Sequence, residues 1–99
     1  MAKRKIIWSH RARIRLFEIL DFYNDRNKST LYSKKLYSRI IKELALLAKQ
    51  PELGVKTEVE FVRGLIIGDY IIFYQAYDER IVVHNIWDSR RNPEELKII

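Results

Sequence analysis

The chain has 99 residues, a net charge of +6 and no cysteine, and these properties narrow its class. Its length fits one domain, so we treat residues 1–99 as a single folding unit. A hydrophobic content of 47% excludes an intrinsically disordered chain, despite 32% charged residues. Without cysteines or an apolar run of about 20 residues, the chain fits neither a disulfide-stabilised secreted domain nor a membrane-spanning protein. These features predict a cytoplasmic protein.

The positive charge results from 19 Lys and Arg residues against 13 Asp and Glu residues. A field of this sign favours nucleic acid, a ribosomal surface or an acidic protein as the partner. Solubility alone accounts for such a charge equally well.

The first elements predicted are a strand and a helix. Residues 5–9 are rich in β-branched and aromatic side chains, which is typical of a strand, and Ser9 is a suitable N-cap. Apolar side chains then recur at spacings of three and four as far as about residue 23. This spacing predicts an amphipathic helix.

A second, longer helix is predicted over residues 30–49, after a polar break in which Asn27 or Ser29 is the expected cap. Its apolar stripe also has helical spacing, and Pro51 ends it. Two amphipathic helices joined by a short loop are expected to form an antiparallel hairpin.

The hydrophobic pattern changes from residue 59 onward. Residues 59–67, 70–77 and 80–87 are three strand candidates, separated by the tight turns Gly68-Asp69 and Asp78-Glu79. They predict an antiparallel meander.

The predicted order is therefore β-α-α-β-β-β, an α+β fold in which an N-terminal helical hairpin packs on an antiparallel sheet. The first strand is expected to join the sheet at or near an edge. Continuous apolar runs in the strands indicate that both faces of the sheet are partly covered. The helices cover one face, and a partner or a second copy of the chain is a candidate for the other.

The strand region resembles the RelE/ParE toxin superfamily, also called plasmid-stabilisation toxins. The resemblance lies in Arg63, the turn at Gly68, the Tyr-x-Ile-x-Tyr-like strand over residues 70–74, and the terminal run at residues 90–93. The N-terminal half is similar to the family more loosely, through Trp8-Ser9. The resemblance implies a growth-inhibiting toxin of a type II toxin–antitoxin system, neutralised by a cognate antitoxin. RelE-like members cut mRNA in the ribosomal A site, and ParE-like members inhibit DNA gyrase.

The residues at the expected nuclease positions favour the ParE-like mechanism. RNA cleavage requires an acid, a base and cations for the phosphorane. Arg63 occupies the place of a phosphate-facing arginine, with a structural role as the alternative. The family's second arginine is replaced by Ile71, and its His-Tyr or lone Tyr after the last strand is replaced by Ser89 and Arg90. The chain is therefore expected not to be an RNase.

Four side chains are candidates for the functional site. Arg63, Arg90 and Arg91 are candidate contacts to a target or to phosphate. If the chain were an RNase, Arg63, His84 and Arg90 would be its candidate catalytic groups, although packing within the sheet is the more common role of such a histidine. No cofactor is expected, and no Asp/Glu/His cluster has metal-ligand spacing.

We therefore predict a ParE-like toxin that binds a target such as DNA gyrase without being an enzyme. The alternatives are a RelE-like, ribosome-dependent mRNA interferase acting on ribosome-bound mRNA, and a degenerate toxin that binds only its antitoxin. The expected partners are the cognate antitoxin and the target, with a homodimer or a toxin–antitoxin hetero-oligomer as the assembly. The antitoxin is expected on the exposed apolar stripe of the hairpin or on the second sheet face.

Overall fold

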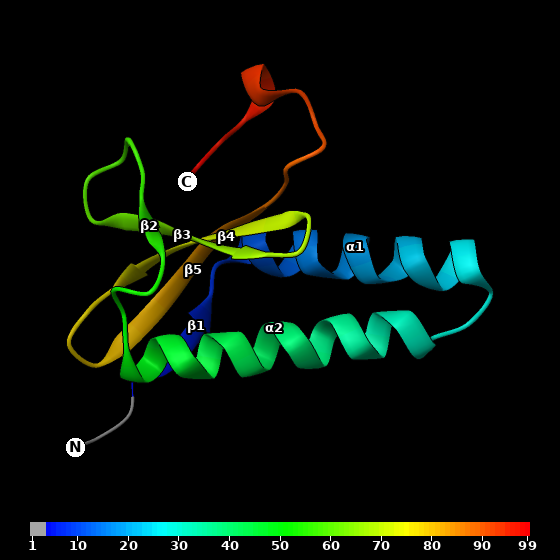
Figure 1. Ribbon diagram of the computed structural model, residues 1–99, viewed down its shortest axis with the longest axis horizontal. Coiled ribbons are helices and arrows are strands. Elements are labelled where there is room, and N and C mark those ends of the chain that lie inside the picture. Colours follow the sequence, from blue (N-terminus) through cyan, green and yellow to red (C-terminus); the bar gives the residue numbers. More distant parts are fainter. Residues whose placement is uncertain (1–3) are drawn as a thin grey trace.

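A computed structural model describes residues 4–99 and shows two helices packed on a five-stranded sheet (Figure 1). The helices are α1 (His10–Asn27) and α2 (Leu31–Lys49). The strands are β1 (Lys5–Trp8), β2 (Val55–Lys56), β3 (Val62–Ile67), β4 (Tyr70–Ala76) and β5 (Arg80–Asp88). A short 3-10 helix, Pro93–Glu95, follows β5. The predicted α+β class and helical hairpin are confirmed.

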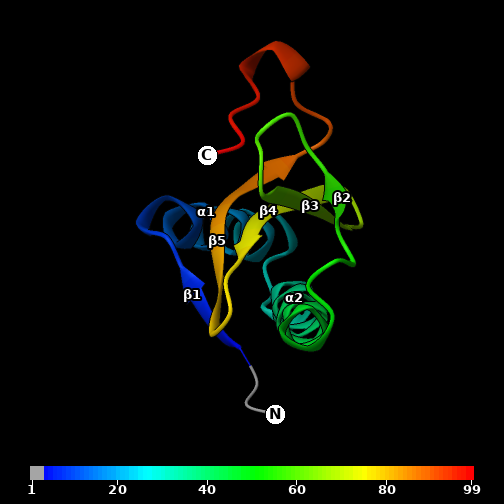
Figure 2. The ribbon, with the colours of Figure 1, turned by 90° about the vertical axis from the view of Figure 1, so that its left-hand side faces the viewer.

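The sheet has the strand order β1-β5-β4-β3-β2, so β1 and β2 form its two edges (Figure 2). The predicted meander is present as antiparallel β3, β4 and β5. Strand β1 pairs in parallel with β5, which makes the sheet mixed where an antiparallel sheet was expected. Two strands joined by a tight turn must be antiparallel. Strands β1 and β5 are connected through all the other elements, and so long a connection allows either direction.

Both helices start and end near the predicted positions. The Ser9 hydroxyl accepts a hydrogen bond from the backbone N–H of Ala12, as expected of an N-cap. Helix α1 continues past residue 23 to Asn27 and ends at Lys28, whose φ of 53° is left-handed. The N-cap of α2 is Thr30, so the expected cap at Asn27 or Ser29 was wrong: Asn27 still belongs to α1, and the Ser29 hydroxyl only accepts from the N–H of Leu31 just outside the cap position.

The main core lies between the hairpin and one face of the sheet. The largest fully buried side chains include Ile40 and Leu44 of α2, Ile72 and Tyr74 of β4, and Ile86 of β5. The loop end of the hairpin, around Lys28, extends beyond the sheet (Figure 1). None of the helices in residues 4–99 has the length and apolar character needed to cross a membrane.

The other face of the sheet carries a second, smaller cluster. Val62, Phe73 and Trp87 are buried there, with Val59 and Ile98 packed against them. Ile98 belongs to the C-terminal tail, which turns back toward the sheet (Figure 1). The Nδ2 of Asn85 donates to the carbonyl of Lys97 at 2.7 Å and holds the tail in place. This face was expected to need a partner or a second copy, and the chain's own tail covers part of it.

The segment before β3 departs from the predicted strand over residues 59–67. The strand begins only at Val62, because Phe61 has a left-handed φ of 68° that is incompatible with a strand. The two-residue strand β2 was not predicted, since two residues are too few to show a periodic pattern.

Candidate functional site

Arg90 lies just after β5 and is held by several partners. Its Nε and Nη2 donate to the two carboxylate oxygens of Asp88, each at 2.9 Å, in the paired geometry that guanidinium groups favour. Its Nη1 is 3.7 Å from Asp69, and its Nη2 is 3.5 Å from the hydroxyl of Tyr23. Arg90 therefore links α1, the β3–β4 turn and the end of β5, rather than standing as an isolated cation.

Two tyrosines continue this network into the core. The Tyr70 hydroxyl donates to the Tyr23 hydroxyl at 3.0 Å, and both side chains are buried. This hydrogen bond lowers the pKa of Tyr23, whereas burial raises the pKa of Tyr70. Tyr70 and Tyr74 both belong to the main core cluster.

Asp88 is the main partner of Arg90. The hydrogen bonds from Arg90 lower the pKa of the Asp88 carboxyl. The pairing follows a simple local pattern, a carboxylate at the end of a strand and an arginine two residues later. Tyr23 and Asp69, in contrast, reach Arg90 only through the tertiary fold, so sequence spacing could not indicate them.

The lowered pKa gives a testable pH dependence. A depressed carboxylate pKa stabilises the fold above the unfolded pKa of about 4, and that contribution is lost as the pH falls through the folded value. We expect Asp88→Asn to lower the urea midpoint at pH 7 and to change it much less at pH 3. Urea unfolding at the two pH values measures this, with the exposed Asp21→Asn as the control. Equal losses at both pH values would contradict the assignment.

Arg91 points to a different part of the surface. Its Nη2 is 3.3 Å from a Glu95 carboxylate oxygen, and its guanidinium lies 5.1 Å from the centroid of the Trp87 ring. Arg91 also lines a hollow of about 700 Å³ beside α1, which includes Arg11 and Arg15. The fold thus brings Arg11 and Arg15 of α1 next to Arg91, which follows β5.

Arg63 is hydrogen-bonded to backbone carbonyls of the turn after α2. Its Nη1 donates to the carbonyl of Gly54 at 2.8 Å and lies 3.5 Å from that of Glu52. The same turn is held by Tyr74, whose hydroxyl accepts from the N–H of Gly54 at 2.9 Å and donates to the carbonyl of Pro51 at 2.7 Å. Arg63 and Tyr74 together fix the connection from α2 to the sheet.

His84 lies in β5 and is half-buried. Its Nε2 is 3.2 Å from the Oε1 of Gln75 on β4, and burial lowers its pKa, which favours the neutral ring. The register shifts by one residue beside His84, so His84 is the extra residue of a β-bulge. These contacts fit a packed histidine in the sheet.

The three groups considered for RNA cleavage lie apart. Arg63 is paired across the ladder with Tyr74, whereas Arg90 lies by Tyr70, four residues and therefore about 13 Å away along β4. His84 bonds to Gln75, which follows Tyr74 and therefore lies on the opposite face of the sheet. Arg63 lines the hollow beside Phe61 and Arg90 lines another beside Tyr70, and neither of these two hollows is lined by a second group of the three.

A groove with a mainly apolar lining lies between the two helices. It has a volume of about 690 Å³ and is lined by Phe17 and Tyr37, which are 58% and 44% exposed, together with Trp8. Arg13 and Lys34 lie at its margin. Helix α2, which forms one wall, carries five Lys and Arg residues against one Glu. Asp21 also lines the groove, which therefore combines aromatic surface with two cations and one carboxylate.

The described residues contain no group of three or more His, Cys, Asp or Glu side chains that could hold a metal ion.

Comparison with known proteins identifies the family. A family model described as "ParE toxin of type II toxin-antitoxin system, parDE" matches residues 6–93. Among solved structures, one from the "Chromosomal ParDE TA system from P. aeruginosa" is similar, with a TM-score of 0.71 and 19% identity, over 85% of this chain and 94% of that chain. That likeness shows the fold alone. A search of curated proteins found no match. Since the family model spans most of the chain, this protein belongs to the ParE toxin family of type II toxin–antitoxin systems.

Proposed function

We propose that the chain inhibits growth by binding a protein target, with DNA gyrase as the first candidate, and that it does so without cutting RNA. The observation that carries this proposal is the separation of Arg63, His84 and Arg90, each of which is engaged by its own partners within the fold. General acid–base chemistry needs such groups within hydrogen-bond reach of one substrate. A binding function makes no such demand.

The experiment measures gyrase supercoiling in the presence of purified toxin. Inhibition that depends on toxin concentration and is relieved by the cognate antitoxin is the expected result. Unchanged supercoiling at saturating toxin would contradict gyrase as the target. Ribosome-dependent mRNA cleavage that disappears in Arg63→Ala would favour the RelE-like alternative, and expression without growth arrest would indicate a degenerate toxin.

The inter-helix groove is the proposed binding site of the antitoxin. Its aromatic lining suits the apolar face of an amphipathic segment, and the cations of Arg13, Lys34 and α2 suit acidic residues on that segment. The second sheet face, the other expected site, is partly covered by Ile98 of the chain's own tail. The groove therefore has better support, and the toxin–antitoxin hetero-oligomer is the assembly we propose.

A further inference from the structure

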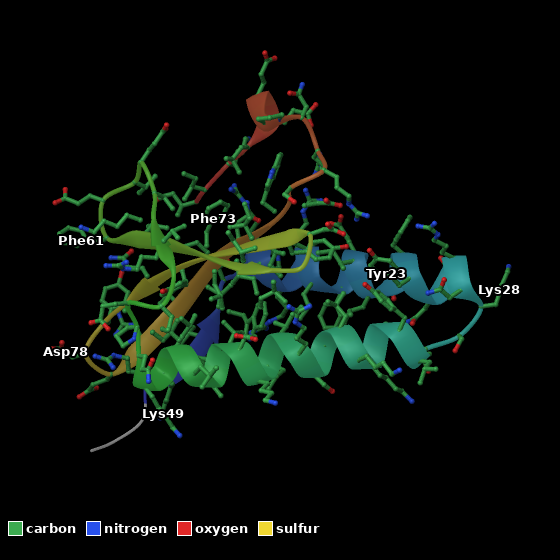
Figure 3. The ribbon with its side chains drawn as sticks, viewed as in Figure 1. Tyr23, Lys28, Lys49, Phe61, Phe73 and Asp78 are labelled. Atoms are coloured by element: carbon green, nitrogen blue, oxygen red, sulfur yellow. The ribbon has the colours of Figure 1, made fainter. Side chains whose placement is uncertain are left out.

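Phe61 is the most exposed large hydrophobic residue of the described chain, at 74%. It lies on the connection between β2 and β3, at the end of the molecule opposite Lys28 (Figure 3). Its backbone φ is 68°, in the left-handed region that glycine and asparagine tolerate and bulky residues avoid. Two unfavourable features, an unburied ring and an unfavourable backbone conformation, therefore coincide at one residue.

The surrounding loop is firmly built. The hydroxyl of Thr57 accepts from the N–H of Val59 at 3.1 Å and donates to the carbonyl of Val62 at 2.9 Å. The N–H of Val62 donates to the carbonyl of Val59 at 3.1 Å. Val59 and Val62 also pack on Phe73 and Trp87, on either side of Phe61 along the chain. The loop is thus anchored at both ends, and these anchors hold the Phe61 backbone in its conformation.

Phe61 belongs to neither hydrophobic cluster of the described chain, so packing of its ring there does not offset the unfavourable backbone conformation. If stability alone determined the residue at position 61, we would expect glycine or asparagine, which tolerate this backbone conformation, or a polar side chain, which suits an exposed position. Unfavourable backbone conformations that are held by their surroundings are concentrated where proteins contact ligands. A ring held outward in advance also loses little conformational freedom when it binds.

The surroundings of Phe61 indicate the chemistry of its partner. Glu58 and Glu60 are exposed on the same loop, in a chain whose net charge is +6. A hollow of about 610 Å³ adjoins the loop, and besides Phe61 it is lined by the cations Arg4, Lys56 and Arg63 and by the carboxylates Glu52, Glu60 and Asp78, so the acidic character belongs to the loop and not to the hollow. An acidic loop that presents an aromatic ring suits a protein surface with an apolar pocket and a basic rim.

We propose that Phe61 is the aromatic anchor through which the toxin binds its protein target, by inserting into an apolar pocket rimmed by Lys or Arg. This inference rests on the proposed function in assuming a protein target, and it does not depend on that target being gyrase. The antitoxin is not the proposed occupant, because the inter-helix groove shares no lining residue with the hollow at Phe61. The glutamates would also repel an acidic antitoxin segment.

The decisive variant is Phe61→Gly. If Phe61 is an anchor, the variant should be more stable than wild type, whereas if Phe61 is needed for folding, the variant should be less stable. Glycine relieves the left-handed backbone at a site where no packing is lost, so we expect a higher thermal midpoint. The same variant is expected to lose growth arrest on induced expression and to raise the toxin concentration for half-inhibition of gyrase at least tenfold. Phe61→Trp keeps an aromatic ring and should retain the arrest.

Two controls define the comparison. Phe22→Ala removes another exposed aromatic ring, on α1 and outside the loop, and should leave growth arrest and gyrase inhibition within twofold of wild type. The affinity of Phe61→Gly for the cognate antitoxin should equal that of wild type. A tenfold loss of that affinity would assign Phe61 to the antitoxin and overturn the proposal.

The remaining outcomes separate this inference from the proposed function. Phe61→Gly that still arrests growth like wild type, or that unfolds at a lower temperature, overturns the inference alone. If the wild-type toxin arrests growth but does not inhibit gyrase, gyrase is not its target. The role of Phe61 is then judged from whether the Phe61 variants still arrest growth. A wild-type chain that arrests no growth would overturn both. Loss of self-association in Phe61→Gly with arrest retained would assign the ring to a second copy and overturn the inference.

Discussion

Replacing Phe17 with glutamate is expected to weaken binding of the cognate antitoxin roughly 100-fold, so that co-expressed antitoxin no longer rescues growth. Phe17 lines the inter-helix groove and is 58% exposed, so the fold should tolerate the change. A carboxylate at this position would remove an aromatic contact and compete with the acidic residues of the antitoxin for Arg13 and Lys34. We expect a loss of about 3 kcal/mol, and each 1.4 kcal/mol is about tenfold in affinity. Calorimetric titration of antitoxin into toxin measures the change.

The matched control is Phe22→Glu. Phe22 lies on the same helix, is similarly exposed at 53%, and does not line the groove. The control introduces the same charge and should change antitoxin affinity by less than threefold. If both variants weaken binding alike, net charge rather than the groove governs the interaction.

Replacing Gly54 with alanine is expected to lower the free energy of unfolding by about 3 kcal/mol, the upper part of the usual range for overpacking. A Cβ at this position would lie 2.6 Å from the Tyr74 hydroxyl oxygen and 2.9 Å from the backbone carbonyl of Gly64. The backbone carbonyl cannot move aside as a flexible side chain can. The added methyl group would therefore push apart the turn that Arg63 and Tyr74 hold, as urea unfolding would detect.

Gly64→Ala provides the comparison for this prediction. At Gly64 the nearest contacts of an added Cβ are side-chain atoms, Ile71 Cγ2 at 3.0 Å and Phe73 Cε1 at 3.4 Å. These atoms can shift by a few tenths of an ångström, so the loss should be about 1 kcal/mol. A larger loss at Gly64 than at Gly54 would show that the turn tolerates a side chain after all.

The parts of the fold that could be predicted are those with a local signal. The apolar stripes located both helices, the two-residue turns located the three strands of the meander, and Ser9 marked the start of α1. The direction of β1 could not be predicted, because it depends on which strand 75 residues later in the chain lies beside it. Nor could the left-handed Phe61, since a phenylalanine carries no sign of such a backbone.

The candidate site was predictable only in part, for a similar reason. Arg63, Arg90 and Arg91 were recognisable from their place in the family pattern, and charge alone does not reveal which partner a guanidinium will find. For Arg90 the partners came from α1 and the β3–β4 turn as well as from its own segment. For Arg63 they were backbone carbonyls of the turn after α2. Such contacts depend on how the elements pack.

The parallel pairing of β1 with β5 has a consequence for how the molecule is assembled. Strand β1 is made first, yet its ladder partner, and the carbonyl of His84 to which Ser9 donates, belong to the last strand. Closing so long a loop costs entropy that only the finished sheet can offset. During synthesis the N-terminal strand therefore has no place to dock until β5 has emerged. Assembly of this toxin's sheet is thus a late event relative to synthesis of its strands, completed only after β5 has been made.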